Sequence, residues 1–138
     1  MSERERSTAA KELSSRAMVV FSREAASVGE ARLWIEAFLE ARGVLDGVRE
    51  DVQLVVSELV TNGLMHGAGE LVVRSAITAD DVHVSVSDSG DGLPEVLPID
   101  PTRVGGLGLI VVGRLSTEWG VAAFPGGKTV WATLALPS

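Results

Sequence analysis

The chain has 138 residues, 46% hydrophobic and 22% charged, which is the composition of one globular domain rather than of a disordered segment. Twelve basic against nineteen acidic residues give a net charge of −7, which argues against direct binding to nucleic acid. The absence of cysteine excludes disulfides, thiolate catalysis and cysteine-based zinc sites.

Residues 1–16 are mostly charged or small, which predicts a flexible N-terminal arm ahead of a domain over residues 17–138. The arm has no apolar stretch of the kind found in secretory signals, and no apolar run approaches the ~20 residues needed to cross a bilayer. We therefore expect a soluble, cytoplasmic protein that makes no membrane contact.

The first half of the domain shows clear periodic patterns. Apolar, β-branched residues predict a strand over 17–21, and an apolar stripe predicts a helix over 27–43 that ends at Gly43. Asp46 is expected to cap a second helix that runs to about Met65. Alternating apolar and polar residues then predict two strands, over 71–77 and 82–88, joined by a tight turn near residues 79–81.

A long segment over residues 89–108, rich in glycine and proline, predicts an irregular loop of the length that often serves a function. A helical pattern resumes over 107–117, and a hairpin with strands over 121–124 and 129–136 closes the chain. The element order predicts an α/β (α+β) two-layer sandwich, with a mixed, mostly antiparallel sheet and helices on one face.

A polar column runs along the second helix beside its apolar stripe. Glu58, Asn62 and His66 recur every fourth position and so lie above one another. A solvated helix face is one interpretation. The other is chemical: an amide oxygen can ligate Mg²⁺, and a glutamate one turn away can accept a proton during phosphoryl transfer.

Asp88 and the glycines around the long loop form a second candidate group. Asp88 shares the parity of Val82, Val84 and Val86, so its strand carries a carboxylate to the edge of the covered face. It could equally start a turn. The glycines after it, and those before the next helix, suit either a close approach of backbone to an anionic ligand or a flexible hinge.

Taken together and in this order, three stretches carry a family resemblance. "ELVTNGLMHG" resembles the N box, "DSGDGLP" the first glycine box and "GGLGLIVV" the second glycine box of the ATP-binding domain shared by gyrase, Hsp90 chaperones, histidine kinases and MutL proteins. The chain is most similar to the small bacterial anti-sigma factor serine-protein kinases. The resemblance covers roughly residues 20–137 and implies the Bergerat-type ATP-binding fold.

The resemblance implies a role for each matching residue. Glu58 would be the general base, Asn62 would hold Mg²⁺, and Asp88 would accept a hydrogen bond from the adenine amino group. Residues 93–104 would form the lid over ATP, with Arg103 as its one basic residue. Thr129 would contact adenine, although strand parity places Lys128 on the covered face instead. The other implied nucleotide-binding residues are Gly90, Gly92, Gly105, Gly106, Leu107, Gly108 and Leu109.

The function implied by the resemblance is an ATP- and Mg²⁺-dependent serine/threonine-protein kinase. It would phosphorylate an anti-anti-sigma antagonist of the STAS type and sequester a sigma factor when free, and the family suggests a homodimer. The alternative is a non-catalytic ATP-binding module that regulates a partner by contact. Glu58 favours the kinase, because a pure binder needs no base, whereas the short lid with one arginine favours the module.

Overall fold

The computed structural model describes residues 15–90 and 108–137. Within these ranges the chain forms five strands and three helices. In chain order they are β1 (Arg16–Phe21), α2 (Ala26–Glu40), α3 (Asp46–His66), β2 (Leu71–Ile77), β3 (Asp81–Asp88), α4 (Gly108–Leu115), β4 (Glu118–Phe124) and β5 (Gly127–Ala135). The element order matches the prediction. Of the arm expected over residues 1–16, residues 1–14 lie outside the described residues, and Arg16 already begins β1.

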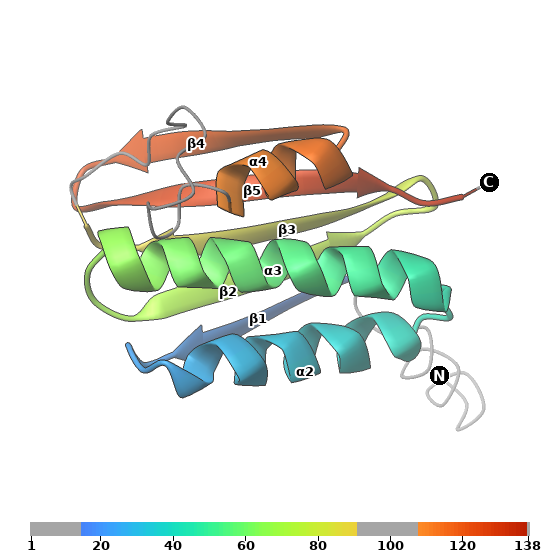
Figure 1. Ribbon diagram of the computed structural model, residues 1–138, viewed down its shortest axis with the longest axis horizontal. Coiled ribbons are helices and arrows are strands. Elements are labelled where there is room, and N and C mark those ends of the chain that lie inside the picture. The colour runs from blue at the N-terminus through green and yellow to red at the C-terminus, as the bar shows by residue number, and fades with distance from the viewer. Residues whose placement is uncertain (1–14, 91–107, 138) are drawn as a thin grey trace, which may run out of the picture.

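The strands form a single sheet in the order β1-β2-β3-β5-β4, and each neighbouring pair is antiparallel (Figure 1). The two-layer architecture is confirmed, whereas the mixed character expected of the sheet is not found among the described strands. The topology explains why. Strands β3 and β4, which are separated in the chain by α4, run in the same direction and would form a parallel pair if they were neighbours. Strand β5 lies between them and is antiparallel to both.

All three helices cover the same face of the sheet, with α3 between α2 and α4 (Figure 1). The buried stripe of α3 packs on alternate residues of the central strands. Side chains recur on one face about every 3.6 residues in a helix and every 2 residues in a strand. Buried members of this core include Ile35, Leu39, Val52, Val55, Val56, Leu59, Val60, Leu71, Val73, Val82, Val84, Val112 and Val130.

The start of α3 differs from the prediction in one respect. Asp46 is the first helical residue, Leu45 occupies the N-cap position, and no side chain caps this end. The Asp46 carboxylate instead accepts a hydrogen bond from Arg49 Nη2 at 2.5 Å. Arg49 Nε also donates to Glu36 at 2.8 Å, so this charge cluster joins α2 to α3.

Strand β4 begins at Glu118, three residues before the predicted 121. Trp119 and Val121 face the helices and pack on the core, while Gly120 between them lies under the ring of Trp131. A side-chain carbon at position 120 would meet that ring at 2.9 Å, so packing requires glycine here, although glycine weakens the pattern of a strand.

The helix-free face of the sheet carries a mixed surface. Met18 and Val20 are exposed there at one edge. Toward the other edge, His83 stacks on Trp131 with ring centroids 5.6 Å apart, and its Nδ1 lies 3.0 Å from Thr133 Oγ1. His83 is half-buried because Trp131, a diagonal neighbour on β5, stacks on it.

In the part of the chain that the structure describes, no helix has both the length and the apolar character needed to cross a membrane.

The central position of α3 predicts a large difference between two leucine truncations. Leu59 is 1% exposed, whereas Leu33 on the outer face of α2 is 73% exposed. Leu59→Ala should lower the free energy of unfolding by about 2–5 kcal/mol because it leaves a cavity. Leu33→Ala should change it by no more than about 0.5 kcal/mol. Urea unfolding followed by circular dichroism measures both, and equal losses would contradict the packing described here.

Candidate functional site

The polar column on α3 divides into a buried member and two accessible ones. Asn62 is 8% exposed, and its Oδ1 has no hydrogen-bond partner in the structure. Glu58, one turn earlier, is half-buried and forms no hydrogen bond or ion pair with another described residue, and His66 is exposed near the helix end. A buried amide oxygen without a donor is costly, and no described residue donates to Asn62 Oδ1, which leaves this oxygen available to another group.

Asp88 ends β3 beside the last turns of α3. It is 6% exposed, and its Oδ1 accepts hydrogen bonds from the backbone N–H groups of Gly90, at 2.7 Å, and Ala68, at 3.4 Å. The bond from Gly90 is the turn-forming contact that the sequence allowed as one interpretation. Among the described residues no donor reaches Oδ2, so the turn leaves one oxygen of the carboxylate available.

Lys128 is the third donor to Asp88. Its Nζ lies 3.1 Å from Oδ1, and the side chains of the two residues are each 2% exposed. The pair follows from strand register, because Asp88 and Lys128 are cross-strand partners on β3 and β5. The sequence placed Lys128 on the covered face by parity but gave it no role, since parity does not reveal which residue lies opposite.

The close approach of α3 to β3 depends on glycines. A Cβ at Gly67 would lie 2.4 Å from Cγ of Asp88, and a Cβ at Gly63 would lie 2.8 Å from Leu71 and 4.0 Å from Asp88 Oδ2. Gly63 thus makes room for Leu71 of β2 against the helix. Because Gly63 follows Asn62 directly, the amide and the carboxylate belong to one region of the molecule, where α3 and β3 end together.

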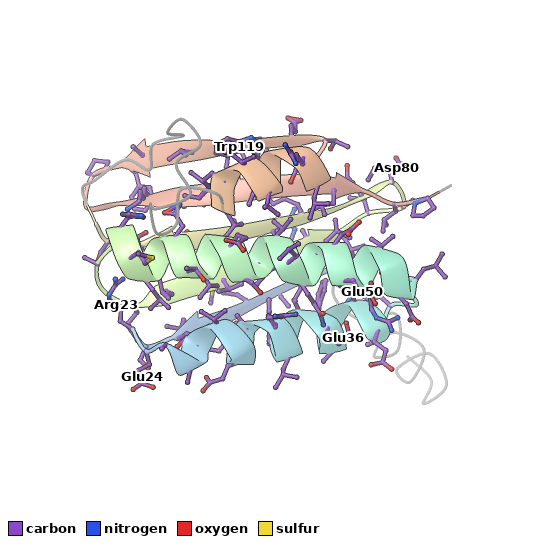
Figure 2. The ribbon with its side chains drawn as sticks, viewed as in Figure 1. Arg23, Glu24, Glu36, Glu50, Asp80 and Trp119 are labelled. Carbon is purple, nitrogen blue, oxygen red and sulfur yellow. The ribbon has the colours of Figure 1, made fainter. Side chains whose placement is uncertain are left out.

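Arg23 fixes this end of α3 from the segment between β1 and α2. Its Nη1 donates to the carbonyl of Gly63 at 3.0 Å, and its Nη2 donates to the carbonyl of Leu64. Figure 2 shows Arg23 beside the carboxyl-terminal end of α3. A cation here satisfies free carbonyls and complements the helix dipole. No pattern in the sequence predicts this contact, which joins residues about 40 positions apart.

Thr129 lies on the helix-free face of the sheet, where it lines the same hollow as Asp88. Thr129 is the cross-strand partner of Ser87, and their hydroxyl oxygens lie 2.7 Å apart on the helix-free face. With Arg74 and Phe124 it lines a hollow of about 510 Å³. The alternation of side chains along β5 is the reason, because it turns Lys128 toward the helices and Thr129 away from them.

The remaining expected residues are only partly described. Gly90 is buried beside Asp88, α4 begins at Gly108, and Leu109 is 5% exposed in the core. The described residues contain no cluster of three or more His, Cys, Asp or Glu side chains that could hold a metal. The other residues expected to bind nucleotide, Gly92, Arg103, Gly105, Gly106 and Leu107, lie outside the described residues.

Comparison with known proteins identifies the fold and the family. The model of the histidine kinase-like ATPase domain matches residues 21–134, and the chain belongs to this family. The serine-protein kinase RsbW of Listeria monocytogenes is 31% identical over 108 residues, which cover 66% of this chain and 69% of that protein. RsbW of Oceanobacillus iheyensis is 27% identical over 109 residues, 66% of this chain and 68% of its own. The resemblance to anti-sigma factor serine kinases is therefore confirmed at the level of the family.

Solved structures agree on the fold. The crystal structure of the RsbU and RsbW domains of a Mycobacterium tuberculosis protein superposes with a TM-score of 0.69 at 21% identity, over 89% of this chain and 33% of that one. The present chain thus spans about a third of that protein. The catalytic domain of histidine kinase ThkA superposes with a TM-score of 0.53 at 18% identity, over 87% of this chain and 96% of that domain.

The close contact at Gly67 predicts opposite effects of two alanine substitutions. Gly67→Ala should lower the free energy of unfolding by about 1–3 kcal/mol, because the new methyl group would displace the Asp88 carboxylate. Gly29→Ala, in α2 with nothing within 4 Å of the added carbon, should raise it by about 0.5–1 kcal/mol. Urea unfolding of both variants tests this, and a stabilised Gly67→Ala protein would show that the carboxylate is not held as described.

Proposed function

We propose that the protein is an ATP-dependent serine/threonine-protein kinase of the anti-sigma factor type. One observation carries the proposal: the buried Oδ1 of Asn62 has no partner among the described residues, and Asn62 is next to Gly63, which closely approaches β3 near Asp88, so the proposed metal ligand and the proposed adenine acceptor would share one region. The family supports the use of ATP, and the two serine-protein kinases above support the reaction class.

The donor set at Asn62 fits a magnesium ion. Mg²⁺ prefers oxygen ligands and keeps several of its waters, so a single protein oxygen beside phosphate groups is a sufficient anchor. A neutral amide adds no negative charge that would repel the phosphates. When bound, the ion would neutralise charge that develops on the phosphoryl group.

Glu58 is the residue proposed to handle the proton. It lies one helical turn before Asn62 and is half-buried without a described partner, so it is free to meet a hydroxyl group of a substrate protein. In this role it orients a serine hydroxyl toward the γ-phosphate and accepts its proton, while the bond from the serine oxygen to the γ-phosphorus forms and the bond from that phosphorus to the β,γ-bridging oxygen breaks, which releases ADP. Asp88 meanwhile holds the adenine amino group through Oδ2.

The proposed partners follow from the family. The phosphate acceptor would be a small STAS-type anti-anti-sigma protein, and the protein held in its absence would be a sigma factor, with the kinase acting as a homodimer in the cytoplasm.

The lack of any described contact that orients Glu58 as a base favours the second candidate, a non-catalytic module in which ATP occupancy governs partner binding.

The magnesium site can be tested by calorimetry without measuring activity. Titration of the protein with ATP, with and without MgCl₂, should show tighter binding when magnesium is present. Asn62→Leu should remove this gain, on the order of 10- to 100-fold, because the metal loses its protein ligand. Met65→Ala, an exposed position on the same helix, should keep it. If the gain survives in Asn62→Leu, the metal is held elsewhere.

The proton-transfer role calls for a separate experiment. With γ-³²P-labelled ATP, MgCl₂ and candidate anti-anti-sigma proteins, the wild type should label a serine of one of them. Glu58→Gln should slow labelling by about 10²–10⁴-fold while ATP affinity stays the same. Glu50→Gln, an exposed acid on the same helix, serves as the control. Unchanged labelling in Glu58→Gln would refute the base role, and ATP binding with no labelling by the wild type would favour the module.

A further inference from the structure

The buried lysine of β5 has more hydrogen-bonding capacity than the protein uses. Lys128 is 1% exposed, and its ammonium group carries three N–H donors. One donor reaches Asp88 Oδ1 at 3.1 Å, and no other described residue accepts from it. Two donors of this buried cation therefore have no acceptor within residues 15–90 and 108–137.

A purely structural role accounts poorly for a charge at this position. The next residues of β5 on the same face are Val130, Ala132 and Leu134, all buried and apolar. A further apolar side chain would extend this row, and replacing a buried ion pair by apolar residues is often neutral or stabilising. The lysine and its two free donors thus need a reason beyond packing.

The hydrogen bonds of Asp88 show how a ligand would meet the pair. Its Oδ1 accepts from Gly90, Ala68 and Lys128, whereas its Oδ2 has no donor among the described residues. The pair consequently offers one free acceptor, Oδ2, beside free donors on Nζ. A group that donates to Oδ2 comes within reach of the ammonium on its flexible stem.

The complementary ligand edge carries a donor next to an acceptor. Adenine has this edge, because its N6 amino group and its N1 are attached to the same ring carbon. We propose that Lys128 donates a hydrogen bond to N1 of adenine while Asp88 Oδ2 accepts from N6, which makes Lys128 a specificity-determining residue of the nucleotide site. This inference rests on the proposed use of ATP and extends it to a residue that the N box and glycine boxes do not contain.

The chemistry of N1 allows a test on the unmodified protein. In 1-deaza-ATP a C–H group replaces N1, and in 7-deaza-ATP a C–H group replaces N7 on another edge of the base. By calorimetry with MgCl₂, the wild type should bind 1-deaza-ATP about tenfold or more weakly than ATP, because a bond from a charged donor is lost. It should bind 7-deaza-ATP about as tightly as ATP. Equal binding of ATP and 1-deaza-ATP would overturn the proposal.

Variants at position 128 then assign the effect to the lysine. Lys128→Met should bind ATP and 1-deaza-ATP within about twofold of each other, and Lys128→Arg, which keeps charged donors, should retain a preference for ATP. Lys128→Gln keeps a neutral N–H donor, so its preference should be intermediate, and it serves if the methionine variant does not fold. The affinity for ATP is divided by the affinity for 1-deaza-ATP within each protein, so an equal loss of affinity for both nucleotides does not change the ratio.

The outcomes also separate this inference from the proposed function. One outcome is that the wild type binds ATP while Lys128→Met or Lys128→Gln keeps the full wild-type preference for ATP over 1-deaza-ATP. In that case another group donates the hydrogen bond to N1 and Lys128 is structural, while the kinase proposal stands. If the wild type binds none of the three nucleotides at millimolar concentration, both proposals fail together.

Discussion

The close approach of the end of α3 to the end of β3 is the constraint on which the rest of the site depends. Two glycines permit it, since a side-chain carbon at Gly67 would overlap Asp88 and one at Gly63 would press on Leu71. The buried apolar stripe of α3 fixes the rotation of the helix, and that rotation leaves Asn62 at the margin of the core. The rotation of α3 therefore determines both how the core packs and where Asn62 lies.

The ion pair at this junction adds a second constraint of a different kind. Asp88 and Lys128 are both almost fully buried, and each would be a severe liability without the other. Their cross-strand register makes the pairing automatic once β3 and β5 align. The carboxylate is thereby fixed by three donors on one oxygen, which keeps the geometry of the other oxygen defined before any ligand arrives.

Much of the fold followed from the sequence, because the periodic patterns of α2, α3, β2 and β3 agree with their burial. The errors have local causes. The expected cap at Asp46 failed because Arg49 competes for its carboxylate, and the start of β4 was missed because Gly120 weakens a strand pattern unless Trp131 lies over it. The all-antiparallel sheet depends on the insertion of β5 beside β3, which is a tertiary fact that no local pattern encodes.

The site was less accessible to sequence reasoning than the fold. The polar column and Asp88 were found because their spacing and parity are local properties, and the family model now supports the domain they belong to. The contact between Asp88 and Lys128 required the strand register, and the expected adenine contact of Thr129 stays a prediction, with its hydroxyl 2.7 Å from that of Ser87. Arg23 was missed altogether, because a hydrogen bond from a connecting segment to helix carbonyls leaves no periodic trace.

That arginine has a mechanical consequence. Arg23 belongs to the short connection between the edge strand β1 and α2, yet it grips the last turn of the helix that carries Asn62. It also lies 3.4 Å from the carbonyl of Gly69, in the bend that leads back toward the sheet. Arg23 thus links the end of β1, the last turn of α3 and the bend at Gly69 through hydrogen bonds. A displacement of the β1 edge would therefore shift the residues that surround the Asp88 carboxylate.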